Sequence, residues 1–279
     1  MDVMDVIASH AAQLPAIDDR WIPRPYATQE LVAGLLEGRM AGPVVSHPMD
    51  NVLRNIRLLT EDDPDKQFGM SGLAGSMGPS EVLGLVAHAA GFEADPRWVS
   101  GPVPVDPALV IEACREVGDR LAFACRRGER VILATGHPVG LAHLYVEVGS
   151  LLRDRGVRLL EPAEGVGWWE DGRPHRWQLR YLRSVAMLTD EISARHTHSG
   201  EPMRRMLAEA RPDLVFADHG FAGAAIEAGV ETVSIADVND PALLVARAQG
   251  RTRTVIVMDD NVQPETYWPC FQAIASRLP

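Results

Sequence analysis

Titratable residues follow almost every apolar segment in the second half of the chain. The segments run into the sequences ATGHP, LTDE, FADHG, IADVND and VMDDN, which carry His137, Asp190, Asp218, His219, Asp237, Asn239, Asp240, Asp259 and Asp260. Asp, Asn and Gly after a strand often serve only as helix caps and turn formers. A cap does not require histidine, however, and five such segments together favour one shared site.

Asp218-His219-Gly220 carries the sharpest signal for a metal ion. A carboxylate and an imidazole at the end of a strand, beside a glycine that relieves crowding, suit a divalent cation. Asp237 and Asp240 add carboxylate oxygens, although Asp240 could equally cap the helix that follows it. A ligand set without thiolate fits Mn, Mg, Zn, Fe or Ni, and the sequence does not choose among them.

Three further histidines are candidates for proton transfer in catalysis. His137 lies between a predicted strand and a predicted helix, where the alternative is a tight turn in which its ring packs structurally. His196 and His198 precede a helix that is expected to begin near Glu201. We expect only one of these two histidines to face the site unless the loop bends; in the alternative reading both lie exposed in a capping segment.

Two segments could bind phosphate. In ATGHPVG, residues 134–140, Gly136 and Gly140 flank a strand-to-helix turn, where backbone N–H groups and the helix dipole attract anions. The segment lacks the Lys-Ser/Thr pair of a Walker loop and the three-glycine spacing of a dinucleotide fingerprint. The other segment surrounds a helical pattern in the first half of the chain; its candidates are Asp50 as a metal ligand and Asn51, Arg54 and Arg57 as substrate contacts. Arginines one turn apart suit phosphate oxygens, whereas Asp50 or Asn51 could simply cap the helix.

Positioning these residues requires the strand–helix alternation that begins at Arg130. We expect strands at 131–135, 157–162, 184–190, 214–220, 232–237 and 254–260, and helices at 139–155, 201–210, 221–229 and 241–248. A hairpin is expected across 168–182, around the turn signal Asp171-Gly172. Apolar strands that alternate with helices predict a three-layer α/β fold with a mainly parallel, Rossmann-like sheet, whose ligands bind at the carboxyl ends of the strands.

The first part of the chain differs in texture. Prolines interrupt helical patterns at 29–39, 51–59, 80–90 and 106–126. We therefore expect two regions, a largely helical N-terminal cap over residues 1–120 and the Rossmann-like domain over residues 121–279, which carries most site residues.

The charge composition limits the classes of partner that are expected. The 279 residues include 38 acidic and 27 basic ones, and the formal net charge is −11. Such a surface repels nucleic-acid phosphates and anionic bilayers, so neither is an expected partner. Three widely spaced cysteines and the absence of an apolar leader fit a cytoplasmic protein, and a homo-oligomer remains open.

Several motifs together resemble a family of actinobacterial phosphatases. They are DNVL, ATGHPVGL, HTHSGEPM, ADHGFAG, ADVNDPAL and DDNVQPETYWP, and they run from Asp50 to the C-terminal part of the chain. Val52 and Asn261 depart from the DNNL and DDH forms that are frequent in the family. More distantly, the chain is similar to metal-dependent phosphatases with an Asp-Asn metal site, although here His219 follows Asp218, which implies a different ligand set.

The leading hypothesis is a metal-dependent phosphatase that hydrolyses a small phosphorylated metabolite of the sugar- or nucleoside-monophosphate type. A divalent ion held by Asp218, His219 and either Asp237 or Asp240 would polarise the phosphoryl group and activate water. His137 or His196 would give a proton to the leaving group. The alternatives are a metal-assisted lyase, a non-phosphate hydrolase of specialised metabolism, and a non-catalytic binding protein for a phosphorylated metabolite.

Overall fold

The computed structural model describes residues 18–95, 97–170 and 176–279, and its centre is a nine-stranded sheet. Seven strands follow the order β3-β4-β5-β1-β7-β8-β9, while β2 pairs with β1 and β6 pairs with β5. The strands are β1 (Arg130–Thr135), β2 (Arg158–Leu159), β3 (Gly167–Trp169), β4 (Arg176–Leu182), β5 (Val185–Thr189), β6 (Ala194–Arg195), β7 (Leu214–Asp218), β8 (Thr232–Ala236) and β9 (Thr254–Val257).

Five neighbouring strands, β5-β1-β7-β8-β9, are parallel. The register places Val131 opposite Leu214 and Val215 opposite Thr232. Every residue of β7 and β8 is buried, because helices cover both faces of a parallel sheet. The parallel arrangement predicted for these strands is confirmed.

The other end of the sheet is antiparallel. β3, β4 and β5 pair in antiparallel fashion, so the expected hairpin is present, while its expected turn at Asp171-Gly172 lies outside the described residues. The strand expected over 157–162 is reduced to β2. The Leu160 amide still donates to the Val131 carbonyl, but Pro162 has no N–H with which to continue the ladder.

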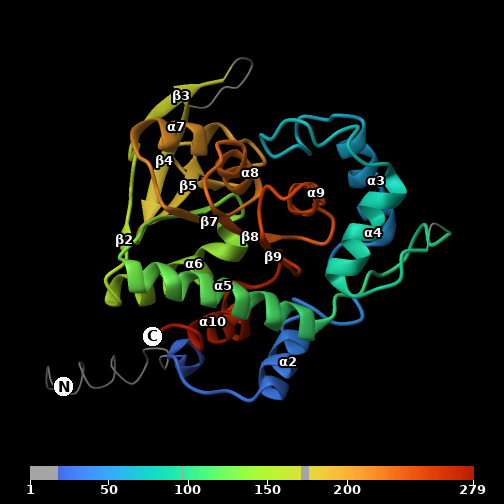
Figure 1. Ribbon diagram of the computed structural model, residues 1–279, viewed down its shortest axis with the longest axis horizontal. Coiled ribbons are helices and arrows are strands. Elements are labelled where there is room, and N and C mark those ends of the chain that lie inside the picture. The colour runs from blue at the N-terminus through green and yellow to red at the C-terminus, as the bar shows by residue number, and fades with distance from the viewer. Residues whose placement is uncertain (1–17, 96, 171–175) are drawn as a thin grey trace, which may run out of the picture.

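Helices form the outer layers, as Figure 1 shows. α5, α6 and α10 pack together on one face of the sheet, and α7, α8 and α9 on the other. Their bounds are α5 (Pro107–Arg127), α6 (Pro138–Asp154), α7 (Glu201–Glu209), α8 (His219–Glu227), α9 (Ala242–Ala248) and α10 (Trp268–Ala275). The predicted three-layer α/β fold is confirmed. Within the described ranges, no helix is both long and apolar enough to cross a membrane.

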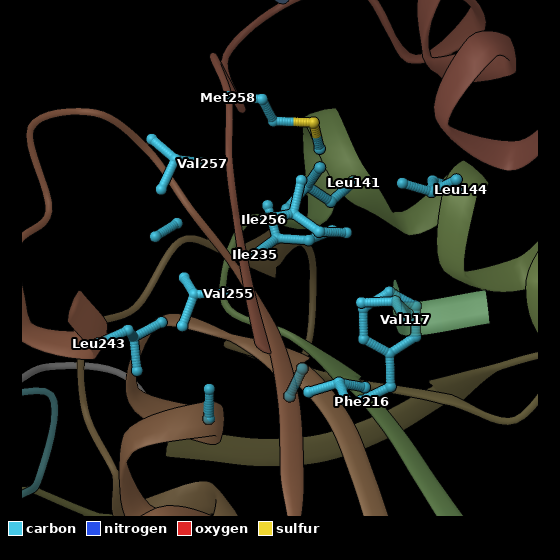
Figure 2. Packing of buried hydrophobic residues seen from close by; sticks show 14 of the residues in the cluster. Val117, Leu141, Leu144, Phe216, Ile235, Leu243, Val255, Ile256, Val257 and Met258 are labelled. Carbon is cyan, nitrogen blue, oxygen red and sulfur yellow. The ribbon is translucent and has the colours of Figure 1, made fainter. Parts of the chain in front are cut away.

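The core follows from the alternation of side chains along the strands (Figure 2). Ile256 of β9 lies on the side of Leu141 of α6, whereas Val255 and Val257 lie on the side of Leu243 of α9. All five are at most 4% exposed. Each strand is thus anchored on both faces, which fixes the position of its carboxyl end.

The chain leaves β1 and β7 in opposite directions. α6 follows β1 and leads to β2 and β5, while α8 follows β7 and leads to β8 on the other side. The two helices cover opposite faces, so the carboxyl ends of β1 and β7 flank the point where the strand order reverses. Crevices at such points are the usual ligand sites of open α/β sheets.

The N-terminal region packs around this unit. It contains the short 3-10 helix η1 (Asp19–Trp21), α2 (Thr28–Glu37), α3 (Met49–Thr60) and α4 (Pro79–Ala90); a second short helix, η2 (Pro264–Tyr267), precedes α10. α2 packs on α5 and α10, and α4 packs on α3 and α9. Buried residues of both regions form one continuous cluster, and residue 120 lies inside α5, so the division of the chain at that point remains a prediction.

Candidate metal centre and active site

A pocket of about 260 Å³ lies where the carboxyl ends of β1, β7, β8 and β9 meet, and it contains five of the nine histidines of the chain. Its lining residues are His47, Asn55, Lys66, His137, His196, His198, His219, Asp237, Asn239, Asp240, Asp260 and Asn261. The residues that follow separate strands therefore come together, as expected of a shared site. Local sequence preferences do not explain why these residues come together, because the strands that carry them are far apart in the sequence.

His219 occupies the centre of the pocket. Its Nδ1 lies 2.8 Å from Oδ1 of Asp218, and its Nε2 lies 3.5 Å from Oδ2 of Asp240 and 3.6 Å from Oδ2 of Asp260. Asp218 Oδ1 also accepts a 2.7 Å hydrogen bond from the Gly136 amide. Asp218 therefore orients the ring of His219, as outer carboxylates commonly orient metal-binding histidines.

The backbone and the protonation of His219 both reflect its position. Its φ of +46° lies in the left-handed region, which is uncommon for residues other than glycine and is concentrated at functional sites. Burial alone would lower the pKa of His219, but hydrogen bonds to Asp218 and Asp240 outweigh burial and raise it well above its usual value. The surrounding carboxylates therefore favour the protonated form of the ring in the metal-free protein.

His196, His198 and His219 form a candidate metal-binding group, because one ring nitrogen of each lies within 4.8 Å of those of the others. His198 Nδ1 lies 2.9 Å from Asp65 Oδ2, which gives this histidine a carboxylate partner as well. The surrounding residues partly desolvate His196, although some of its side chain is exposed, and together with the charges of the neighbouring histidines they lower its pKa to about 4. His196 is therefore neutral at physiological pH, as a metal ligand must be.

The expectation that only one of His196 and His198 faces the site is wrong. Their ring centroids are 4.9 Å apart, and both rings line the pocket. Residues i and i+2 of an extended segment lie on the same side, so the spacing itself permits this arrangement. The Thr197 amide between them donates to the Gly136 carbonyl at 2.9 Å and ties the segment to the end of β1.

Buried carboxylates lie close to this candidate group. Asp218, Asp237, Asp240 and Asp260 are each no more than 6% exposed. Burial raises the pKa of Asp237 and of Asp260, and the charge of Asp260 raises that of Asp237 further. Within the described parts of the chain, both carboxylate oxygens of Asp237 and Oδ2 of Asp218 and Asp260 have no hydrogen-bond partner. Buried carboxylate oxygens that accept no hydrogen bond from described residues fit a divalent cation.

Two of the nine strand-end residues have structural roles instead. Asp259 accepts hydrogen bonds from the Ser46 amide at 2.6 Å and the Ser46 hydroxyl at 2.9 Å. Asp190 accepts from the Ser193 amide at 2.8 Å and pairs with Arg195. Neither carboxylate lines the pocket, and the reading of such residues as turn and loop formers holds for these two.

Gly136 and Gly140 serve packing. The Gly136 amide is already bound to Asp218, and a Cβ at this position would lie 2.6 Å from the Thr197 carbonyl oxygen. A Cβ at Gly140 would collide with the Asp260 carbonyl oxygen. These glycines let the segments that carry His196 and Asp260 approach the end of β1. The Gly136 amide is occupied by Asp218 and is therefore not free to bind phosphate.

α3 covers the site through Asn239. Asn55 Nδ2 donates to the Asn239 carbonyl at 2.9 Å, and Asn51 Oδ1 accepts from Asn239 Nδ2 at 2.7 Å. Asn51 and Arg54 line an adjoining pocket of about 350 Å³. Asp50 and Arg57 are exposed on α3 and line neither pocket, so they are not positioned to bind the metal or its substrate.

Sequence reasoning missed His47, Asp65 and Lys66 and did not assign Asp260 as a ligand. His47 Nε2 lies 3.3 Å from Asp237 Oδ2, and Lys66 Nζ lies 3.2 Å from Asp65 Oδ2. One signal was available for Lys66: it is the only lysine of the chain, against 26 arginines.

A larger pocket of about 800 Å³ adjoins the metal-binding group and shares His196 and His198 with it. The β3–β4 hairpin forms one side of this pocket with Trp168 and Trp177, and α7 contributes Arg205. The Arg205 guanidinium carbon lies 4.4 Å from the centroid of the Trp168 ring. This surface offers flat aromatic and cationic groups beside the histidines.

Comparison with known proteins identifies the family of this chain. The family model described as Phosphatase matches residues 26–278. The chain is 36% identical over 253 residues to Phosphatase SCO2771 of Streptomyces coelicolor, an alignment that covers 88% of this chain and 94% of the relative. No solved structure matches. The resemblance noted in the motifs is thereby confirmed, and the chain belongs to the Phosphatase family.

Proposed function

We propose that this protein is a metal-dependent phosphomonoester hydrolase that acts on a small phosphorylated metabolite. The observation that carries the proposal is the gathering of His196, His198 and His219 in one pocket with the unpartnered, buried carboxylates of Asp237 and Asp260. Membership of the Phosphatase family supports the reaction class.

His196, His198 and His219 would hold the metal, together with Asp240 and Asp260, whose carboxylates lie within 3.6 Å of His219 Nε2. A divalent ion, when bound, would polarise the phosphoryl group and lower the pKa of water at the site. Asp237 lies next to this group, with both oxygens free of hydrogen bonds from described residues, and completes its negative charge.

Other residues of the chain would orient the metal ligands and protonate the leaving group. Asp218 and Asp65 hold the rings of His219 and His198 through their Nδ1 atoms. His137 is the N-cap residue that precedes α6; it lines the pocket, and its ring centroid is 5.0 Å from that of His196. Since His196 belongs to the ligand set, we assign proton donation to the leaving oxygen to His137.

The adjoining 800 Å³ pocket supports a substrate with a ring-bearing leaving group, such as a sugar or nucleoside monophosphate. With the phosphoryl group near His219, the leaving group would extend past His196 and His198 toward Trp168 and Arg205. Aromatic rings stack on sugars and nucleobases, and the guanidinium adds polar contacts.

The test measures inorganic phosphate released from a panel of sugar and nucleoside monophosphates by the purified protein, before and after chelation and after addition of single divalent metals. We expect release that chelation abolishes and one or more metals restore. Activity unchanged by exhaustive chelation would reject the metal. No release with any metal would reject hydrolysis and favour a metal-assisted lyase, a non-phosphate hydrolase or a binding protein.

A further inference from the structure

We propose that Lys66 binds the phosphoryl oxygens of the substrate and of the inorganic phosphate product. The inference rests on the proposed function and adds to it a residue that nothing in the motifs points to. The starting observation is compositional: Lys66 is the only lysine in 279 residues, while 26 arginines occupy the other basic positions. The one lysine of the chain lies at the site.

Lys66 sits where the metal pocket meets the adjoining 350 Å³ pocket, and it lines both. Its side chain is only 14% exposed, although it lies in the connection between α3 and α4. Among the described residues that line the metal pocket, it is the one side chain with a permanent positive charge. A phosphate dianion that enters beside Asp237, Asp240 and Asp260 needs such a charge to offset their repulsion.

The residues that follow Lys66 fix its position. Gln67 Nε2 donates to the Leu59 carbonyl at 2.9 Å, which ties the loop to α3. The Phe68 ring packs against the rings of His198 and His219, with centroids 5.0 Å and 5.4 Å away. Gln67 and Phe68 are both buried, so the ammonium group is presented from an anchored segment.

The ion pair with Asp65 leaves the ammonium group of Lys66 able to bind a ligand as well. In the described parts of the chain, Asp65 is the only acidic residue within 4 Å of Nζ, at 3.2 Å, and the same Asp65 oxygen lies 2.9 Å from His198 Nδ1. An ammonium group has three donors, so donors remain for the oxygens of a ligand. Asp65 thus links the phosphate-binding charge to a metal-binding histidine.

A merely structural role would not explain the choice of lysine. The other ion pairs of the described residues that involve Lys or Arg are made by arginine, so a structural pair with Asp65 would not call for the exceptional residue. Lysine is a compact point charge on a flexible stem, whereas arginine is a larger planar fork. In a pocket of about 260 Å³ shared with five histidines, the compact group leaves room for phosphate.

The single lysine permits a direct binding test on the intact protein. Lysine labelled with ¹³C at Cε and supplied during expression gives one lysine signal, which reports Lys66 alone. We expect inorganic phosphate, titrated in the presence of Zn²⁺ or Mg²⁺, to shift this signal with saturation. Sodium chloride at equal ionic strength should not. A signal that phosphate leaves unmoved, or moves no more than chloride does, would overturn the proposal.

Variants supply the second test. We expect Lys66→Met to lower kcat/KM and to raise the inhibition constant of inorganic phosphate, each roughly 10- to 100-fold, as for the loss of one charge-assisted hydrogen bond. Lys66→Arg should recover only part of each. Arg277→Met, which removes an exposed charge paired with Asp119, is the matched control and should leave both values unchanged.

The two proposals fail separately. If the wild-type protein hydrolyses phosphomonoesters but Lys66→Met keeps the wild-type kcat/KM and inhibition constant, the role of Lys66 is rejected and the proposed function stands. If phosphate shifts the lysine signal but no ester is hydrolysed under any metal condition, phosphate binding stands and the proposed function is rejected. Melting curves show whether each variant is folded.

Discussion

Asp259 and Asp260 are adjacent carboxylates with opposite surroundings. Asp259 accepts two hydrogen bonds from Ser46, whereas Oδ2 of Asp260 lies beside His219 without a hydrogen bond from the described residues. Burial raises the pKa of Asp260, because its charge is poorly compensated in the metal-free protein. The two residues therefore provide a matched pair for mutation.

We expect Asp260→Asn to raise the melting temperature of the metal-free protein and to abolish the further rise that metal produces in the wild type. A gain of about 1 kcal/mol corresponds to roughly 2–4 °C in a protein of this size. Asp259→Asn should instead lower the melting temperature, because hydrogen bonds to Ser46 are lost, and keep the metal-dependent rise. Thermal melts with and without metal distinguish the two, and a wild-type response to metal in Asp260→Asn would remove Asp260 from the ligand set.

His196 gives a pH dependence with a defined sign. In the folded, metal-free protein its pKa is about 4, compared with 6.5 for the unperturbed side chain. Between these values the unfolded chain binds more protons than the folded chain, so this residue destabilises the fold as pH falls from 6.5 toward 4. In NMR spectra of the metal-free protein, the imidazole signals of His196 should stay unchanged from pH 8 to pH 5. A midpoint near 6.5 would contradict the influence of the neighbouring histidines on its pKa.

The sequence predicted that His137, His219, Asp237, Asp240 and Asp260 converge, because each follows an apolar strand, but it also placed Asp190 and Asp259 there, and neither lines the pocket. It did not predict His47, Asp65 or Lys66, which lie in loops whose paths depend on tertiary packing. The phosphate-binding role expected of Gly136 was misjudged for a related reason. An amide at the end of a strand is free for a ligand only if no other segment uses it, and here Asp218 does.

At the scale of elements, the position of the 196–199 segment depends on its close approach to α8. Gly220 lies in the first turn of α8, and a Cβ there would collide with the carbonyl oxygens of His198 and Ser199. We expect Gly220→Ala to displace His198, to lower phosphatase activity at least tenfold and to weaken metal binding. Metal titration and phosphate release measure the two effects.

Gly84→Ala is the control for this substitution. Gly84 lies inside α4, and a Cβ there meets no atom within 4 Å. Alanine should stabilise this helix by about 1 kcal/mol and leave activity unchanged. Equal activity in the two variants would show that the 196–199 segment tolerates movement away from α8.

The β3–β4 hairpin is the element that we connect with the leaving group. We expect Trp168→Ala to raise KM for nucleoside monophosphates several-fold, as for the loss of one aromatic stacking contact. The inhibition constant of inorganic phosphate should not change, because phosphate does not reach this pocket. Leu182→Ala, at the exposed end of β4 and outside the pocket, is the control. An unchanged KM would show that the hairpin does not contact the substrate.

The helices and parallel strands agree closely with the sequence pattern, since apolar periodicity and caps determine both. The helix expected over 139–155 is α6 (Pro138–Asp154), and the helix expected over 106–126 is α5 (Pro107–Arg127). β2 is shorter than expected because its extent depends on pairing with β1. A ladder of this kind cannot be derived from one strand alone.

At the scale of the whole molecule, the fold brings many acidic and imidazole side chains together in one buried place. The reversal of strand order between β1 and β7 opens a crevice, and α3 covers it through Asn239. Three buried carboxylates and five histidines line it, from positions 47 to 260. Such a concentration of acidic groups inside a protein is costly unless positive charge offsets it.

The most direct test is an anomalous difference map from crystals of the protein prepared with Mn²⁺. We expect a peak in the pocket at ordinary ligand distances, about 2.0–2.6 Å, from nitrogens of His196, His198 and His219 and from a carboxylate oxygen of Asp240 or Asp260. A peak elsewhere, or none in the pocket at saturating Mn²⁺ and again with Zn²⁺, would contradict a metal centre at this site.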